Sequence, residues 1–162
     1  MHPLLIAQLL ALLVVANGTP IIVEKILGAS LAFPVDGGRA LADGRPVFGS
    51  SKTVRGLVFS ILATTGLAPL IGLDWKIGAL VALMAMSGDL ISSFVKRRMG
   101  LAPSDRATGL DQLPESVLPL LACIIFLPLT LLDVIAIALI FFVVELVLSQ
   151  FLFKLHIRKR PY

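Results

Sequence analysis

Apolar residues along this chain gather into runs of roughly 15 to 25 positions, separated by polar segments. An α-helix rises ~1.5 Å per residue, so about 20 apolar residues cross the ~30 Å hydrocarbon core of a bilayer. The pattern therefore predicts an all-α membrane protein with a single integral membrane domain over residues 1–162. We expect about five transmembrane helices, at residues 3–27, 57–71, 77–95, 117–131 and 134–153.

The charge of the polar segments predicts the orientation in the membrane. Residues 29–55, residues 96–116 and the C-terminal tail hold every Lys and Arg except Lys25 and Lys76. Five spans place these three segments on one side, and positively charged loops favour the cytoplasm. We therefore expect a cell-membrane protein with two cytoplasmic site loops, a cytoplasmic C-terminus and an N-terminus outside. The first run lacks a basic leader and a clear cleavage motif, so we interpret it as a retained span.

Composition narrows the chemistry that such loops can use. Of the 162 residues, 57% are hydrophobic, and the single cysteine, Cys123, excludes an internal disulfide and a multi-cysteine zinc site. His2 and His156 stand at the two ends of the chain, which argues against a histidine-based nucleophile system. The net charge of +4 does not indicate nucleic-acid binding, because the basic residues are spread through loops that face membrane lipid.

The stretch between residues 88 and 115 carries the strongest chemical signal. Four polar residues at positions i, i+3, i+4 and i+7 form one stripe on the third expected helix; they are Asp89, Ser92, Ser93 and Lys96. An acid inside a span is costly and normally faces a polar cavity or a partner, so a functional role for Asp89 is the default. The alternative is an Asp89–Lys96 ion pair, although at two turns apart the two side chains cannot meet directly.

The same stretch then passes a basic cluster and reaches a pair of acids. Lys96, Arg97 and Arg98 emerge at the membrane surface, where basic residues commonly contact lipid headgroups; Lys96 differs because it continues the polar stripe. Asp111 and Glu115 come just before the fourth expected span. Acids near a helix N-terminus are favoured by the helix dipole, and this capping role suits Glu115. Asp111 lies further out and is freer to bind an ion.

Residues 49–56, Gly-Ser-Ser-Lys-Thr-Val-Arg-Gly, directly precede the second span. Small residues let a backbone approach an anion, and Lys52, Thr53 and Arg55 add two charges and a hydroxyl beside a helix N-terminus. The segment is not a Walker P-loop, since its glycine spacing differs. It indicates a phosphate site, and the open alternative is that Lys52 and Arg55 only anchor a helix end to headgroups.

Several polar residues fit no single role. Asn17 lies close to Pro20, which should kink or break the first helix; the amide either faces a site or bonds a carbonyl freed near the kink. Glu145 lies inside the last span and either pairs with a group such as Asn17 or binds an ion. Asp36 and Asp43 each precede a glycine in a tight turn, and their roles stay open.

Carboxylates accompanied by lysines and arginines favour magnesium over zinc, because Mg²⁺ prefers oxygen ligands, water and substrate phosphates. Acyl transfer and redox chemistry lack their usual groups here. Phosphoryl or nucleotidyl transfer needs mainly positioning and charge neutralisation. A phosphate oxygen is already ionised near neutral pH, so as a nucleophile it needs no protein base.

These motifs resemble the phosphatidate cytidylyltransferases, which make CDP-activated lipids from CTP, and fit their archaeal branch, the CDP-archaeol synthase family. The bacterial pattern continues with a His-Gly-Gly run that this chain lacks. The archaeal pattern covers most of the chain. Its matching elements here are Ala16-Asn17-Gly18-Thr19-Pro20, Asp36-Gly37, Asp43-Gly44, Ser51-Lys52-Thr53-Val54-Arg55-Gly56 and Leu110-Asp111-Gln112-Leu113-Pro114.

The resemblance implies transfer of CMP from CTP to 2,3-bis-O-geranylgeranyl-sn-glycerol 1-phosphate, an isoprenoid glycerol phosphate lipid, with Mg²⁺ and release of diphosphate. We expect Asp89 and Asp111 to be catalytic and to hold one or two Mg²⁺ ions, with Lys96 as a third catalytic residue. The residues expected to bind the CTP or lipid phosphates are Lys52, Thr53, Arg55, Lys96 and Arg97. The alternatives are a phosphatidate cytidylyltransferase, a CTP-dependent polyprenol kinase, and an ion or solute carrier using Asp89 and Glu145.

Overall fold

The computed structural model describes residues 2–103, 105, 107 and 109–155. Within these residues the chain forms helices without any strand, apart from isolated bridges at Pro34–Thr53 and Ala40–Pro46. The helices are α1 (Pro3–Leu27), α2 (Val54–Leu70), α3 (Trp75–Arg98), α4 (Gln112–Cys123) and α5 (Leu131–Lys154). The prediction of an all-α membrane protein is confirmed. The predicted C-terminal tail beyond Leu155 and His156 lie outside the described residues.

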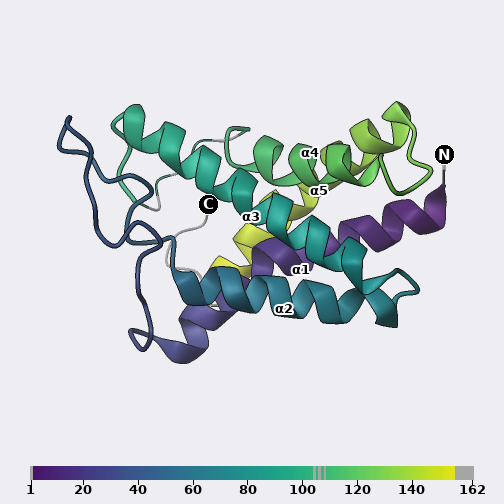
Figure 1. The fold of residues 1–162 in the computed structure, drawn as a ribbon, viewed down its shortest axis with the longest axis horizontal. Coiled ribbons are helices and arrows are strands. Elements are labelled where there is room, and N and C mark those ends of the chain that lie inside the picture. The colour runs from purple at the N-terminus through teal and green to yellow at the C-terminus, as the bar shows by residue number, and fades with distance from the viewer. Residues whose placement is uncertain (1, 104, 106, 108, 156–162) are drawn as a thin grey trace.

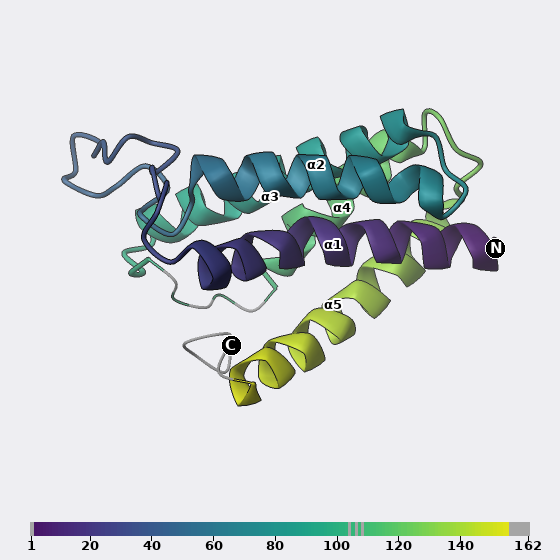
Figure 2. The same ribbon diagram turned by 90° about the horizontal axis from the view of Figure 1, so that it is seen from below.

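The helices run back and forth, so that the two long loops meet at one end of the bundle (Figure 1). The loop from α1 to α2 and the loop from α3 to α4 lie at this loop end, whereas the N-terminus lies at the opposite end. α3 packs against α1, α2 and α4. α5 starts beside α1 and diverges from it toward the loop end (Figure 2). The expectation that both candidate site loops share one side of the protein agrees with this arrangement.

Within the described part of the chain, three helices, α1, α3 and α5, are long and apolar enough to cross a membrane. α2 has 17 residues and Thr53 as its N-cap, so it begins three residues earlier than expected. The predicted fourth span at 117–131 is wrong at both ends, because α4 begins at Gln112 and ends at Cys123. Its 12 residues rise only about 18 Å.

The residues between α4 and α5 explain why α4 ends and α5 begins where they do. Pro128 lacks a backbone donor and disfavours helical geometry in the preceding residue, so the apolar run does not continue as one helix. α5 then starts at Leu131 instead of the expected position 134. Thr130 and Asp133 form a capping box there, with the Thr130 hydroxyl 2.7 Å from the Asp133 carboxylate.

Pro20 lies inside α1 and leaves the Ala16 carbonyl without its usual helical donor. The Ser60 hydroxyl of α2 donates to this carbonyl at 2.6 Å, which links the two helices in the buried interior. Asn17 instead donates to the Leu13 carbonyl at 3.0 Å, one turn earlier. The expectation that Asn17 bonds a carbonyl freed near the kink is therefore wrong, because Ser60 satisfies the carbonyl that Pro20 frees.

Glycines let α3 approach its neighbours closely. A Cβ atom on Gly78 would lie 2.6 Å from the Thr64 carbonyl oxygen of α2, and one on Gly88 would overlap the Pro114 carbonyl of α4. The largest apolar cluster includes Leu12, Val81 and Leu120. Buried polar residues gather toward the loop end of α3 and α4. They are Ser92, Ser93, Lys96, Arg97, Gln112, Glu115 and Ser116.

Candidate active site

The predicted polar stripe on α3 faces the protein interior. Ser92, Ser93 and Lys96 are all at most 7% exposed, and the Ser92 hydroxyl donates to the Asp89 carbonyl at 3.0 Å. Gly88 packs against Pro114 near the start of α4, and the last ten residues of α3, 89–98, extend about 15 Å beyond this contact toward the loop end. Loops therefore cover the stripe on this side, and the site lies below the loop end of the bundle.

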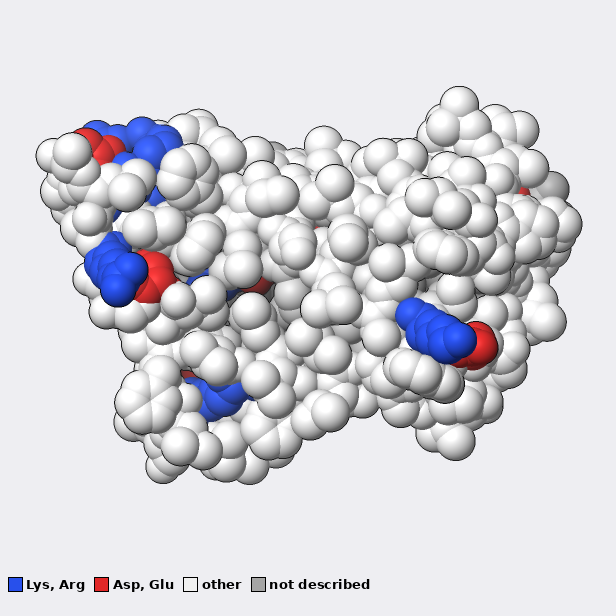
Figure 3. All heavy atoms as spheres, viewed as in Figure 1, with Lys and Arg blue, Asp and Glu red and all other residues white. Residues whose placement is uncertain are grey.

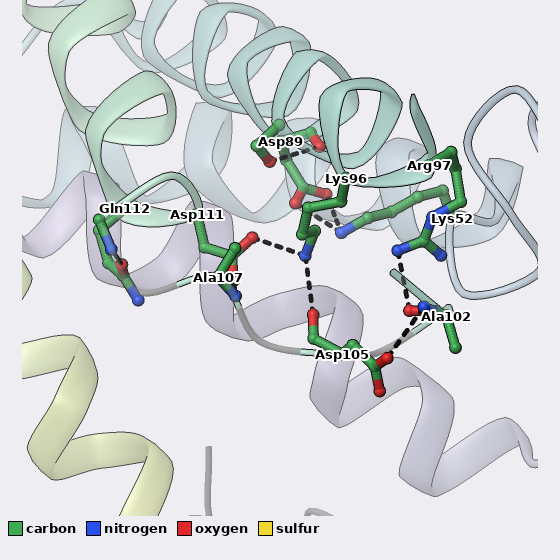
Figure 4. Close-up of polar contacts among 11 residues, drawn as sticks. Lys52, Asp89, Lys96, Arg97, Ala102, Asp105, Ala107, Asp111 and Gln112 are labelled. Carbon is green, nitrogen blue, oxygen red and sulfur yellow. Dashed lines mark hydrogen bonds and ion pairs between the residues drawn. The ribbon is translucent and has the colours of Figure 1, made fainter. Parts of the chain in front are cut away.

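Lys52 meets Asp89 at this site. The Lys52 Nζ lies 2.5 Å and 2.6 Å from the two carboxylate oxygens of Asp89 (Figure 4). The backbone of the first long loop places the lysine there, since Val35 donates to the Lys52 carbonyl at 2.8 Å and Val54 donates to the Phe33 carbonyl at 3.0 Å. Lys52 and Asp89 are 37 residues apart in the sequence, so helical periodicity alone cannot predict that they form a pair.

A second ion pair joins Lys96 to Asp111. Lys96 Nζ lies 2.6 Å from Asp111 Oδ1 and also donates to the Asp105 carbonyl at 3.2 Å (Figure 4). The other carboxylate oxygen, Asp111 Oδ2, accepts a hydrogen bond from the Ala107 amide at 3.0 Å. The second loop is thus folded back over α3 and held by the lysine of the predicted stripe. The sequence left an Asp89–Lys96 ion pair open. In the structure Asp89 pairs with Lys52 instead, and Lys96 pairs with Asp111.

The two pairs belong to one electrostatic cluster. Burial disfavours the Lys52 ammonium, but the carboxylates of Asp89, Glu115 and Asp111 more than offset this cost and raise the pKa of Lys52 above its ordinary value. Asp89 and Asp111 therefore lie around the same cation and at the same end of the bundle. In this structure each contacts a lysine directly.

Glu115 has a contact that sequence reasoning missed. It lies in the first turn of α4, as its expected place near the helix N-terminus requires, but its side chain is 6% exposed and meets the side chain of Asp89. The sequence signal was present, since Gln112, Glu115, Ser116 and Pro119 fall on one buried face of α4. Recognising it required knowing that this face packs against α3.

Arg97 is 3% exposed and has hydrogen-bonding capacity left over. Its Nη2 donates to the Ala102 carbonyl at 2.8 Å (Figure 4), whereas Nε and Nη1 have no hydrogen-bond partner within the residues that the structure describes. Buried donors without a partner are costly and rare. Gly49 lies beside this guanidinium, since a Cβ there would be 3.3 Å from Nη1. The arrangement suits an anion between Arg97 and the segment that starts at Gly49.

Thr53 and Arg55, both predicted to bind phosphate, make structural contacts. Thr53 caps α2 by accepting a hydrogen bond from the Gly56 amide at 3.3 Å. Arg55 is buried, and its guanidinium donates to the Gly28 carbonyl at 2.6 Å and to the Ser30 carbonyl. These contacts fasten the start of α2 to the segment after α1. The structure does not place the Arg55 guanidinium among the contacts of Lys52, Asp89, Lys96 and Asp111.

The first loop is stiffened by two aspartates whose roles the sequence left open. Asp36 accepts hydrogen bonds at 2.9 Å from the amides of Gly38, Phe48 and Gly49. Partial burial raises the pKa of Asp36, but these three bonds outweigh it and hold that pKa below its ordinary value. Asp36 therefore fixes the turn that leads into the Gly49 segment.

Asp43 clamps the same loop to the end of α3. The Arg98 guanidinium donates to Asp43 at 2.6 Å, and Arg45 donates to the Arg98 carbonyl at 2.5 Å. Charged side chains on the visible face gather at the loop end, with one smaller patch at the opposite end and an uncharged surface between them (Figure 3). An uncharged surface of this kind suits the hydrocarbon core of a bilayer, where charged side chains are costly.

The donor set fits a magnesium ion better than any softer metal. No group of three or more His, Cys, Asp or Glu side chains is arranged as a metal site among the described residues. Mg²⁺, however, is commonly bound through one or two carboxylates together with water and substrate phosphates. Asp89 and Asp111 provide such carboxylates, and in this structure the ammonium groups of Lys52 and Lys96 neutralise them.

Comparisons with known proteins agree with the geometry. A family model described as CarS-like, CDP-archaeol synthase, matches residues 1–162. The CDP-archaeol synthase of Sulfurisphaera tokodaii is 34% identical over 154 residues, covering 91% of this chain and 89% of that protein. The enzyme of the same name from Pyrococcus furiosus is 40% identical over 123 residues, covering 69% of this chain and 70% of that protein.

A solved structure described as an intramembrane enzyme for archaeal membrane lipid biosynthesis has a TM-score of 0.73 and 28% identity. The match covers 85% of this chain and 90% of the solved one, so the likeness extends through the bundle. The sequence resemblance drawn from separate motifs is thereby confirmed. The chain belongs to the CDP-archaeol synthase family of cytidylyltransferases.

Proposed function

We propose that this chain transfers CMP from CTP to an isoprenoid glycerol ether phosphate held in the membrane, forming a CDP-activated lipid and diphosphate. The observation that carries this proposal is the partly buried pair of lysine–aspartate contacts at the site that also holds the Arg97 guanidinium, two of whose nitrogens have no partner among the described residues. Three cations and two carboxylates in one loop-covered site suit a magnesium-bound triphosphate and a second phosphate. Family membership favours cytidylyl transfer over the kinase and carrier alternatives.

Asp89 and Asp111 would hold Mg²⁺, which when bound neutralises charge on the triphosphate and polarises its phosphoryl oxygens. Their present partners, Lys52 and Lys96, would then be free of the carboxylates. Both ammonium groups lie beside these carboxylates, and the flexible lysine side chains allow them to turn toward the phosphate oxygens. Arg97 supplies two nitrogens without a partner among the described residues, Nε and Nη1, and Nη1 lies beside Gly49.

The reaction requires no protein base. A lipid phosphate oxygen forms a bond to the α-phosphorus of CTP, and the bond from that phosphorus to the bridging oxygen of the β-phosphate breaks. Diphosphate leaves with the electron pair, and the charge that develops on it is stabilised by Lys52, Lys96 and Arg97. The lipid phosphate is already ionised near neutral pH. The residues present therefore position the groups and neutralise charge, which is the chemistry their types permit.

The loop end faces the cytoplasm in this proposal. Eight of the 14 Lys and Arg residues lie in residues 29–55 and 96–116, at the loop end, and the positive-inside preference orients such segments toward the compartment that contains CTP. Arg39 is an exposed residue of the first loop. In an Arg39→Cys variant, a membrane-impermeant thiol reagent should label this position only when the cytoplasmic face of oriented vesicles is accessible. Labelling from the outside would reverse the orientation.

The activity is tested with the purified protein, labelled CTP and a panel of ether- and ester-linked lipid phosphates, with and without Mg²⁺. We expect diphosphate and a CDP-lipid in equal amounts, preference for the ether lipid, and loss of turnover with EDTA. Formation of CDP and a newly phosphorylated lipid would instead indicate a kinase.

The Asp89→Asn variant tests the role of the carboxylate. We expect it to keep the fold and to lose turnover by about a hundredfold or more, the size seen when a transition-state charge contact is removed. Asp74→Asn is the matched control, because Asp74 only caps α3 at the opposite end, by accepting from the Lys76 amide at 2.8 Å, and asparagine caps equally well. Near-normal turnover by Asp89→Asn removes this residue from the mechanism.

A further inference from the structure

Two large apolar side chains stand exposed in the first long loop, just after α1. Leu31 is 63% exposed and Phe33 is 66% exposed. Single exposed apolar residues are ordinary on a protein surface. These two, however, lie two positions apart and follow closely on the end of a helix that is long and apolar enough to cross a membrane. The chemistry of the site uses neither of them.

We propose that Leu31 and Phe33 insert into the interfacial layer of the bilayer at the loop end, where headgroups meet acyl chains. We call these two residues the loop anchor. Its partner is the surface of the bilayer, not the lipid that reacts. The anchor holds the base of the first loop at a fixed depth in the membrane.

The length of α1 brings the anchor to this layer. The 25 residues of α1 rise about 37 Å, more than the ~30 Å hydrocarbon core but less than the ~40–45 Å that includes the headgroup layers. The Gly28 amide then donates to the Glu24 carbonyl, and the Ser30 amide donates to the Leu27 carbonyl, both at 3.0 Å. These bonds turn the chain tightly at the helix end, so the anchor begins at the level of the headgroups.

The anchor is continuous with the exposed faces of two apolar helices. Ile22 and Ile26 are exposed one turn apart on α1, and Val54 and Val58 are exposed one turn apart on α2. The Phe33 carbonyl accepts a hydrogen bond from the Val54 amide at 3.0 Å, so the anchor adjoins the α2 face. A surface that continues along two apolar helices suits the bilayer that surrounds them. Leu and Phe side chains typically enter the boundary of headgroups and acyl chains to a depth of ~5–10 Å.

The backbone before Phe33 is held in a costly conformation. Among the described residues, Leu31 is the non-glycine position with a positive φ, 56°. Left-handed geometry is unfavourable for a residue with a Cβ atom, and it persists where the surroundings hold it. The Arg55 guanidinium does so by donating to the Gly28 carbonyl at 2.6 Å and to the Ser30 carbonyl. Arg55, expected to bind phosphate, thus braces the segment that presents the anchor.

The anchor is tied directly to the site. Besides the bond from Val54 to Phe33, the Val35 amide donates to the Lys52 carbonyl at 2.8 Å, around the bridge between Pro34 and Thr53. The anchor and Lys52 therefore lie on two paired segments that shift together. The depth of the anchor in the bilayer sets the depth at which Lys52 meets Asp89.

Tryptophan fluorescence tests the insertion without any turnover. The chain has one tryptophan, Trp75 at the start of α3, and Trp75→Phe removes its signal. Phe33→Trp in this background then reports on the anchor. Leu41→Trp is the matched control, because Leu41 is an exposed apolar residue of the same loop at the turn beyond the Ala40–Pro46 bridge. The first loop projects past the helix ends (Figure 1).

Both variants are placed in liposomes with brominated acyl chains, which quench from the bilayer, and are titrated with acrylamide, which quenches from water. Thermal unfolding verifies that they fold. We expect Phe33→Trp to emit at shorter wavelength, to lose emission to lipids brominated close to the headgroup, and to resist acrylamide. Leu41→Trp should lose emission to acrylamide and keep it with brominated lipid.

Three results would overturn the anchor. The first is a Phe33→Trp signal that acrylamide quenches and brominated lipid does not. The second is protection from both quenchers, which would indicate that protein, such as a second copy of the chain, covers the position. The third is equal quenching of both variants by brominated lipid, which would mean that the whole loop lies on the bilayer.

Leu31→Gly, added to the Phe33→Trp reporter, separates the side chain from the backbone at this position. Glycine adopts a positive φ without strain. If Leu31 serves only the turn, the quenching pattern stays unchanged. If its side chain is part of the anchor, the emission should shift to longer wavelength and quenching by brominated lipid should fall. An unchanged pattern would overturn the two-residue anchor.

The link from the anchor to Lys52 is tested by turnover in liposomes, and this test alone rests on the proposed function. Phe33→Glu places a charge where acyl chains begin, which is costly, so the base of the loop should move outward. Turnover should fall, by up to about a hundredfold if Lys52 is misplaced by ~1 Å. Leu41→Glu should retain the wild-type rate.

The outcomes of the two kinds of experiment are distinguishable. If the wild type makes no CDP-lipid, the proposed function fails, and the fluorescence of Phe33→Trp still decides whether the anchor enters the bilayer. Wild-type turnover by Phe33→Glu would show that the anchor does not set the depth of Lys52.

Discussion

Gly88 of α3 packs so closely against Pro114 of α4 that a methyl group on Gly88 would overlap the Pro114 carbonyl. This contact fixes how far α4 reaches along α3. It brings Glu115, the residue after Pro114, to Asp89, the residue after Gly88. The site is therefore built where two backbones touch, and the remaining turns of α3 are left for the loops to cover.

The first prediction concerns this contact. Gly88→Ala should lower the free energy of unfolding by about 1–3 kcal/mol, because overpacking forces the two backbones apart, and turnover should fall with it. Gly66→Ala should be neutral or stabilising by up to about 1 kcal/mol, since its Cβ meets open space in a helix. Thermal unfolding in detergent compares them, and equal stability of the two variants contradicts the contact.

The second prediction concerns Lys52 as the cation that neutralises Asp89 before the metal binds. Removing the ammonium in Lys52→Met leaves carboxylates facing one another, so the metal-free variant should unfold at a lower temperature than the wild type. Added Mg²⁺ should stabilise this variant more than it stabilises the wild type, because the ion no longer competes with the lysine.

Lys76→Met is the control for that measurement. Lys76 lies 6.0 Å from the centroid of the Trp75 ring, at the start of α3 and far along it from Asp89. Its loss should leave the Mg²⁺ response at the wild-type value. A Lys52→Met variant with an unchanged Mg²⁺ response would show that Asp89 does not exchange the lysine for the ion.

The third prediction separates two adjacent arginines. Arg97 has buried guanidinium nitrogens open to a ligand, whereas Arg98 is bonded to Asp43 and to the Pro46 carbonyl. Arg97→Met should lower kcat/KM for CTP or the lipid phosphate by about ten- to a hundredfold, the cost of a lost charged hydrogen bond, with little change in unfolding temperature. Arg98→Met should show the opposite pattern. Steady-state kinetics and thermal unfolding of both variants check this, and a reversed outcome would exchange the assigned roles.

The fourth prediction concerns pH and the first loop. The pKa of Asp36 is lowered in the folded protein, so its ionised carboxylate binds three amides and adds stability above the unfolded pKa of about 4. That contribution is lost as the pH falls through the folded value. Asp36→Asn should therefore be less stable than the wild type from pH 5 to pH 8, with the difference shrinking below about pH 4.

Denaturant unfolding at several pH values measures this difference. Asp43→Asn serves as a comparison, because Asp43 is more exposed and its bond to Arg98 is a surface contact worth less. A stability difference for Asp36→Asn that grows as the pH falls would contradict the hydrogen-bonded carboxylate.

The sequence by itself determined the membrane class, the all-helical fold and the polar stripe of α3. Hydropathy and helical periodicity are local properties, so a run of apolar residues and the i, i+3, i+4, i+7 spacing of Asp89 and Lys96 can be seen without the fold. The same local pattern misplaced α4, because its first residues are polar but buried in protein instead of lipid, and Pro128 divides the apolar run that follows.

Only the tertiary structure decided which charges meet. Lys52 pairs with Asp89 across 37 residues, Lys96 takes Asp111 from the other loop, and Arg55 is used to fasten α2 to the end of α1. Long charged side chains reach several neighbours equally well, so their partners depend on where helices approach. Small residues such as Gly88 set how closely two helices approach. Gly88 acts by lacking a side chain, so it adds nothing to the periodic pattern of apolar and polar residues.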